Sequence, residues 1–137
     1  MKISKNNQYL KSLVLTDKLI NLIEAQVKLA DFDCRLGVIL NFKDPEYSAE
    51  SGGYHPVEIA INYEGEIQYI TDFAYMGSWG MAELVKELDF DFSYGLFQHM
   101  GQDYPLDEGS ELFKIWQDNF CSYHESEVYQ VSLQGFL

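Results

Sequence analysis

The stretch VEIAINYEGEIQYITDFAY, residues 57–75, decides the fold that the sequence predicts. Apolar side chains occupy every second position from Val57 to Ile61, which is the pattern of a strand with one buried face. The dipeptide Glu64-Gly65 interrupts this pattern with a turn signal, and the alternation resumes at Ile67. Two strands joined by so short a turn are antiparallel. Residues 57–75 therefore predict a β-hairpin and, with it, an antiparallel sheet.

The segments on either side of the hairpin supply the remaining elements. Apolar residues at helical spacing follow the N-cap Thr16 and predict a helix over 16–30, and an apolar stripe after Pro105 predicts another helix, capped by Asp107 or Ser110. We also expect a short helix over 82–88 and strands over 35–43, 90–94 and 127–134. The predicted fold class is α+β, a twisted antiparallel sheet with an N-terminal helix and a C-terminal helix packed on it.

Length and composition indicate one domain. The chain has 137 residues, of which 47% are hydrophobic, so it can bury one core and has no room for two ordinary domains. We expect residues 1–137 to form that single domain, with 1–12 as a polar, loosely held arm. The start lacks the apolar stretch of a secretion signal, and no segment is long enough to cross a bilayer. A cytoplasmic location is therefore expected, with Cys34 and Cys121 as reduced thiols.

The charge is strongly acidic and unevenly distributed. Residues 1–43 hold seven basic and four acidic residues, whereas residues 44–137 hold two basic and 18 acidic residues, so the net charges are +3 and −16. A surface of this kind repels the phosphates of nucleic acids and of anionic lipids, which argues against direct binding to nucleic acid or to a membrane. Such a charge would attract basic proteins, polyamines or divalent cations, and we expect a basic protein partner.

The loop 44–55, DPEYSAESGGYH, carries the strongest candidate binding residues. It is longer than a plain strand connection needs, and Gly52-Gly53 permit backbone paths closed to other residues. The Asp44 carboxylate is expected to hold a downstream amide in a turn, and Glu50 is expected to face His55 across the loop. A histidine near carboxylates can ligate a metal or act as a general base, but it can equally anchor a loop by a hydrogen bond.

Loop aromatics complete the candidate set. Tyr and Trp contribute disproportionately to binding surfaces, although loop aromatics can also fold back as lids over the sheet. The predicted binding residues are Asp44, Tyr47, Glu50, Tyr54, His55 and Trp79.

Motifs that carry chemistry are absent from the sequence. It contains no glycine-rich phosphate loop, nucleophile elbow, paired-histidine zinc motif or calcium loop. Cys121 and His124 would share a helix face but lack a third catalytic partner. We therefore assign no catalytic residue and no metal ligand, and we expect no cofactor.

The run D-P-x-Y-S-A-E-x-G-G-Y-H-P-V-E, beginning at Asp44, together with YITDFAYMG (69–77) and ELVKELDFDF (83–92), carries a resemblance. The chain resembles a bacterial family known only as domain-of-unknown-function family 2787, found in marine gamma-proteobacteria and on their mobile genetic islands. The resemblance implies a fold similar to that of the acidic mitochondrial matrix protein that is also a receptor for the globular heads of complement. It further implies a twisted antiparallel sheet with terminal helices and a homo-oligomer, namely a ring-like trimer. The family has no assigned activity, so no catalytic residue carries over.

Three hypotheses about function remain open at this point. The first is a non-catalytic acidic protein that binds or scaffolds a basic protein partner. The second is a nucleic-acid mimic, whose rows of carboxylates would block a DNA-binding protein. The third is a hydrolase or metal-dependent enzyme centred on His55. Regularly spaced exposed carboxylates would favour the mimic, and a concave pocket that converges on His55 would favour the enzyme.

Overall fold

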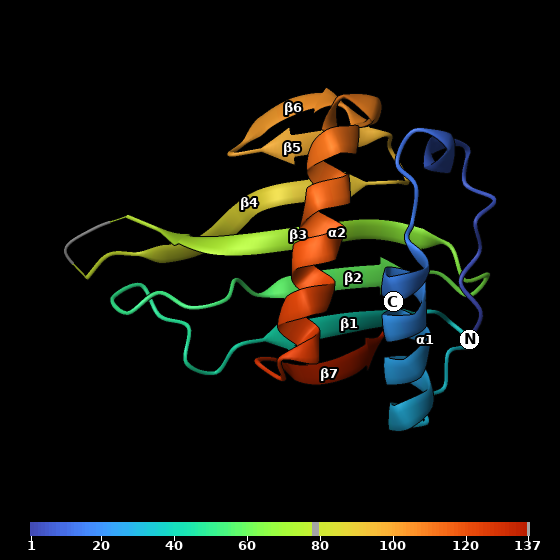
Figure 1. Ribbon diagram of the computed structural model, residues 1–137, viewed down its shortest axis with the longest axis horizontal. Coiled ribbons are helices and arrows are strands. Elements are labelled where there is room, and N and C mark those ends of the chain that lie inside the picture. Colours follow the sequence, from blue (N-terminus) through green and yellow to red (C-terminus); the bar gives the residue numbers. More distant parts are fainter. Residues whose placement is uncertain (78–79, 137) are drawn as a thin grey trace.

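A computed structural model describes residues 1–77 and 80–136 and shows one antiparallel sheet covered by two helices on the same face (Figure 1). The helices are α1 (Asp17–Ala30) and α2 (Ser110–Glu125), and short 3₁₀ turns cover Gln8–Lys11 and Leu106–Gly109. The strands are β1 (Val38–Lys43), β2 (Val57–Ile61), β3 (Ile67–Met76), β4 (Glu83–Asp91), β5 (Leu96–His99), β6 (Gln102–Pro105) and β7 (Gln130–Gly135). The predicted α+β fold class is confirmed. None of the helices in the described part of the chain has the length and apolar character to cross a membrane.

Neighbouring strands of the sheet are consecutive in sequence except at one edge. The order is β6-β5-β4-β3-β2-β1-β7, and every pair is antiparallel. After β6 the chain crosses back over the sheet as α2 and delivers β7 to the far side of β1 (Figure 1). Because α2 crosses the sheet from one edge to the other, its apolar side chains pack against the covered face of the sheet.

The core lies between the covered face and the two helices. Leu40, Ile59 and Ile70 point inward from the central strands, and Leu19 and Ile23 from α1 meet them with no exposed surface. Thr16 caps α1 as expected, since its Oγ1 accepts a hydrogen bond from the Leu19 amide at 3.2 Å. Each of these large aliphatic side chains contributes roughly 1.5–3 kcal/mol by leaving water.

The predicted short helix over 82–88 is wrong, because this segment is the first part of β4. The strand pairs with β3 over its whole length, and the register shifts between Asp72 and Phe73. This bulge makes Lys86 and Leu88 the partners of consecutive β3 residues, so the period of two is broken near Glu87. As a result, the apolar residues Leu84, Val85 and Leu88 are spaced as they would be on one face of a helix. The short hairpin of β5 and β6, at the edge of the sheet, was also not predicted.

Two further expectations are corrected by local contacts. Neither Asp107 nor Ser110 caps α2, because the N-cap is Gly109 at the end of a 3₁₀ turn. Residues 1–12, expected as a loose arm, are attached to the domain: Ile3 is buried, and its amide donates to Glu24 Oε2 at 2.9 Å.

The loop between β1 and β2 is organised by one buried carboxylate. Asp44 Oδ1 accepts from the Glu46 amide and Oδ2 accepts from the Tyr54 amide, both at 2.9 Å. The expected turn by the Asp44 carboxylate is thus present, and the same group also closes the loop ten residues later. Gly53 lies against this anchor, with a φ of +137°. These contacts fix the direction in which the chain enters β2, and with it the position of His55.

Both cysteines are free in the described structure. Cys121 is buried on α2, and Cys34 is partly exposed. Burial raises the pKa of the Cys121 thiol to about 11, which keeps it protonated and unreactive at neutral pH.

We expect Gly53→Ala to destabilise the protein more than Gly52→Ala. A Cβ on Gly53 would lie 2.9 Å from Asp44 Oδ2 and 3.0 Å from Tyr47 Cα, whereas a Cβ on Gly52 meets nothing within 4 Å. Both residues have positive φ, so Gly52→Ala should cost only the backbone strain, about 1 kcal/mol, and Gly53→Ala about 2–3 kcal/mol. Urea unfolding of both variants measures the difference, and equal losses would contradict the close packing of Gly53 against Asp44 and Tyr47.

We expect acid to weaken the fold through His124, near the end of α2. Its Nδ1 is buried without a partner among the described residues, and burial lowers the pKa of His124. The unfolded chain then takes up a proton before the folded chain does, so stability is lost as the pH falls through the ordinary histidine range. Wild type should lose stability relative to His124→Leu between about pH 8 and about pH 5. The same substitution at exposed His99 is the control, and an equal change there would contradict the prediction.

Candidate functional site

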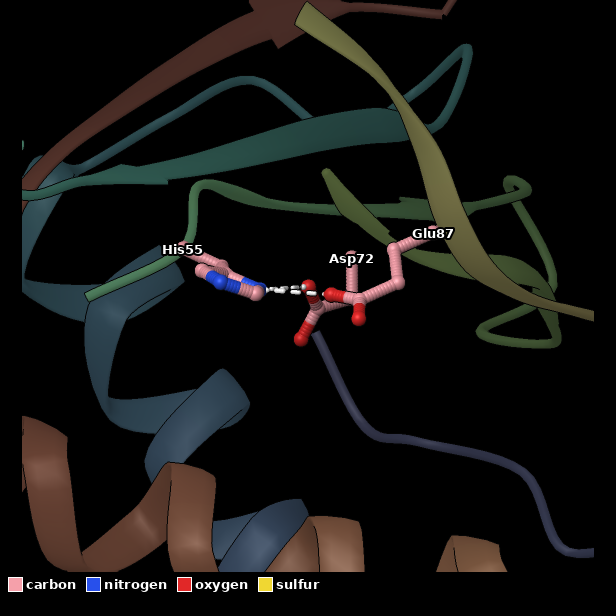
Figure 2. A group of neighbouring side chains, drawn as sticks. All are labelled: His55, Asp72 and Glu87. Carbon is pink, nitrogen blue, oxygen red and sulfur yellow. Dashed lines mark hydrogen bonds and ion pairs between the residues drawn. The ribbon is translucent and has the colours of Figure 1, made fainter. Parts of the chain in front are cut away.

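Three titratable side chains from separate elements meet at one point beside α2. His55 lies two residues before the start of β2, Asp72 lies on β3 and Glu87 lies on β4. His55 Nδ1 is 2.8 Å from Asp72 Oδ1 and 2.8 Å from Glu87 Oε2. Figure 2 shows the three side chains pointing toward one another. The two carboxylates therefore converge on the same ring nitrogen. We call His55, Asp72 and Glu87 the carboxylate–histidine cluster.

A hydrogen bond from α2 holds the carboxylate of Asp72, the more deeply buried of the two acids. Trp116 Nε1 of α2 donates a hydrogen bond to Asp72 Oδ2 at 2.9 Å, so Asp72 is held from both sides by a helix and by a loop. The Asp72 side chain is only 13% exposed. Burial raises the pKa of Asp72, while the hydrogen bonds from Trp116 and His55 act in the opposite direction.

The bulge in β4 explains how Glu87 reaches this position. Adjacent residues of a regular strand point to opposite faces of the sheet. Glu87 and Leu88 nevertheless both line the cavity next to α2, because the register shift opposite Asp72 and Phe73 leaves Glu87 as the extra residue. β-bulges commonly redirect a side chain in this way beside functional sites.

The cluster forms one wall of a cavity of about 490 Å³ between α2 and the sheet. The remaining walls are largely aromatic and aliphatic. Tyr54 and Tyr123 pack with their ring centroids 4.7 Å apart, and the Trp116 ring stacks on Phe120 at 4.9 Å. His99 also lines the cavity. An apolar cavity of this volume with a few converging polar groups has the character of a ligand-binding site.

The structure separates the six predicted binding residues into different roles. Tyr54 and His55 line the cavity, and Tyr47 packs behind His55 with ring centroids 5.4 Å apart. Asp44 is buried as the loop anchor. The expected pairing of Glu50 with His55 is wrong, because Glu50 is exposed and His55 pairs with other carboxylates. Trp79 lies outside the described residues.

Sequence reasoning missed Asp72, Glu87 and Trp116 as members of the site. One signal for Asp72 was present, since it follows Ile70 at the period of a strand and so places a carboxylate on the apolar face. In the sequence, Glu87 alternates with Asp89 and Asp91 at the period of a strand, a pattern typical of a solvated edge. Nothing local in the sequence reveals the bulge that separates it from them.

Comparison with known proteins identifies relatives of the whole domain. The model of the DUF2787 family, described as a protein of unknown function, matches residues 17–134. No curated protein matches the chain.

Two solved structures from Vibrio cholerae are similar over nearly the whole fold. The hypothetical protein VC0508 of the VSP-II pathogenicity island is 36% identical, with a TM-score of 0.79, and the match covers 90% of this chain and 96% of that one. The conserved hypothetical protein VC1805 of pathogenicity island VPI-2, described as sharing structural homology with the human P32 protein, is 35% identical over the same shares, with a TM-score of 0.77. The chain belongs to the DUF2787 family of proteins of unknown function.

Proposed function

We propose that the protein is a non-catalytic binding protein, and that its cavity takes up an arginine side chain of a basic partner protein. The observation that carries the proposal is that two carboxylates, Asp72 and Glu87, share a single histidine at the wall of an aromatic cavity. Even with His55 protonated, the cluster keeps a net negative charge. A cationic group entering the cavity would neutralise it.

Among basic side chains, arginine fits these walls best. Its planar guanidinium can form hydrogen bonds to a carboxylate while its faces stack on aromatic rings, which a lysine ammonium cannot match. The cavity offers both kinds of contact, through Glu87 and through Trp116, Tyr54 and Tyr123. The apolar residues that flank the arginine would cover Leu112 and Ile115 of α2, and Ile115 is 57% exposed.

The distribution of charge supports a basic partner. Among the described residues that line the cavity there is no Lys or Arg. Residues 44–137, which supply every residue of the cavity wall, carry a net charge of −16. A surface of one sign accelerates the approach of a partner of opposite sign and orients it before contact.

The nucleic-acid mimic receives less support from this geometry. Such a protein needs a row of exposed carboxylates, and the three acids that alternate at residues 87, 89 and 91 do not form one. Glu87 points to the cavity, Asp89 is buried with Thr71 Oγ1 donating to it at 2.8 Å, and Asp91 accepts bonds from the turn that follows it.

The enzyme hypothesis gains a concave pocket at His55 but no hydroxyl, thiol or amine nucleophile from Ser, Thr, Cys or Lys among the described residues that line it. Hydrolysis at this site would therefore use either an activated water or a covalent intermediate on a carboxylate, histidine or tyrosine.

The proposal predicts that a Leu-Arg-Phe peptide, labelled with a fluorophore and blocked at both ends, binds the protein. The same peptide with citrulline in place of arginine should bind much more weakly, because citrulline keeps the shape of arginine and lacks its charge. Glu87→Gln should weaken binding of the arginine peptide about tenfold, since a charge-assisted hydrogen bond contributes ~1.5 kcal/mol. Fluorescence anisotropy measures both affinities.

The matched protein control is Glu108→Gln. Glu108 is exposed in the 3₁₀ turn before α2 and does not line the cavity, so this variant removes the same charge elsewhere. It should bind the arginine peptide with nearly wild-type affinity at physiological salt. Equal binding of the arginine and citrulline peptides, or an equal effect of the two Glu→Gln variants, would overturn the proposal.

A further inference from the structure

We propose that the carboxylate–histidine cluster is a binding site for a divalent transition-metal cation of the zinc type. The cluster offers one imidazole nitrogen and two carboxylate oxygens, all within 4.8 Å of one another. Mixed nitrogen and oxygen ligands of this kind suit Zn²⁺ and similar ions. The proposal needs only these three side chains and does not rest on the arginine ligand proposed above.

The geometry around His55 Nδ1 is the first argument. Oxygens of Asp72 and Glu87 each lie 2.8 Å from this nitrogen, but the nitrogen can carry only one hydrogen. That hydrogen cannot point along both directions at once. A cation placed between the three atoms instead contacts all of them simultaneously.

The two distances from His55 Nδ1 permit this exchange after a small movement. Zinc bonds of 2.0–2.2 Å in a tetrahedral arrangement place neighbouring ligand atoms about 3.4 Å apart. Each carboxylate oxygen now lies 2.8 Å from His55 Nδ1. With zinc bonds of 2.0–2.2 Å, each oxygen would have to move about half an ångström away from the nitrogen. Glu87 can make this movement because its side chain is 29% exposed and its carboxylate is carried on two flexible methylene groups.

Charge and outer contacts are the second argument. Two carboxylates and a neutral imidazole carry a charge of −2, which a divalent cation balances. Asp72 keeps its other oxygen on Trp116 Nε1, at 2.9 Å, and this is the kind of outer hydrogen bond that orients metal-binding carboxylates. The three protein ligands leave a fourth position, as in zinc sites that bind water or a substrate group.

The fold brings these ligands together by two separate devices. The loop anchored by Asp44 places His55 two residues before the start of β2, and the bulge in β4 turns Glu87 to the same face as Asp72. A merely solvated carboxylate would need neither device. Both are independent of the hydrogen bonds inside the cluster.

The experiment is a calorimetric titration of the full chain with zinc chloride, without peptide and without an affinity tag. The Cys34→Ser variant serves as the parent, since Cys34 is a partly exposed thiol that could bind zinc on its own. The parent should take up one equivalent of Zn²⁺ per chain. In this background His55→Gln and Glu87→Gln should each weaken zinc binding at least about tenfold.

The matched control is His99→Gln, because His99 lines the same cavity and lies outside the cluster. It should bind zinc as the parent does, and far-ultraviolet circular dichroism checks that each variant is folded. The absorption spectrum of added Co²⁺ gives a second readout, since its visible bands depend on the ligands. The proposal is overturned if the parent takes up no zinc, or if the folded cluster variants bind zinc as tightly as the parent. Because the titration contains no peptide, its failure leaves the arginine proposal to its own test.

Discussion

The hydrogen bond from Trp116 Nε1 to Asp72 Oδ2 is the contact on which the covered face depends. It joins α2 directly to β3 of the sheet, beside the carboxylate–histidine cluster, while the aromatic side chains of α2 around it make apolar contacts. The Trp116 ring also stacks on Phe120, and Phe120 packs edge-on against Phe42 of β1 with centroids 4.9 Å apart. Apolar packing alone would allow α2 to slide or rotate, since it is not directional. The hydrogen bond specifies one position of the helix over the strands.

The same hydrogen bond helps the covered face of the sheet to accommodate the buried carboxylate of Asp72. A buried carboxylate is costly unless its oxygens are bonded, and Asp72 has partners on both oxygens. His55 then links Asp72 to Glu87, whose partial exposure connects the cluster to the cavity. Helix position, cluster and cavity are therefore one arrangement. Arginine and zinc would use the same carboxylates, so the two proposed ligands should compete for the site.

Much of the fold follows from local sequence patterns, and the site follows from their exceptions. The alternation from Val57 to Ile61 and the cap at Thr16 predicted β2 and α1, because each is a signal within a few residues. The bulge near Glu87 is specified by pairing with β3, so no pattern within β4 announces it. His55 was found from its own surroundings in sequence. Its true partners lie 17 and 32 positions further along the chain, where only the folded sheet brings them close.

A double-mutant cycle between Trp116→Phe and Asp72→Ala tests the central claim most directly. Phe keeps a flat aromatic ring and removes the indole donor, and the free energies of unfolding of both single variants and the double variant are measured in urea near neutral pH. The account predicts a coupling energy of about 1.5 kcal/mol or more, as expected for a hydrogen bond to a charged group. Additive effects, with a coupling within about 0.5 kcal/mol of zero, would contradict it.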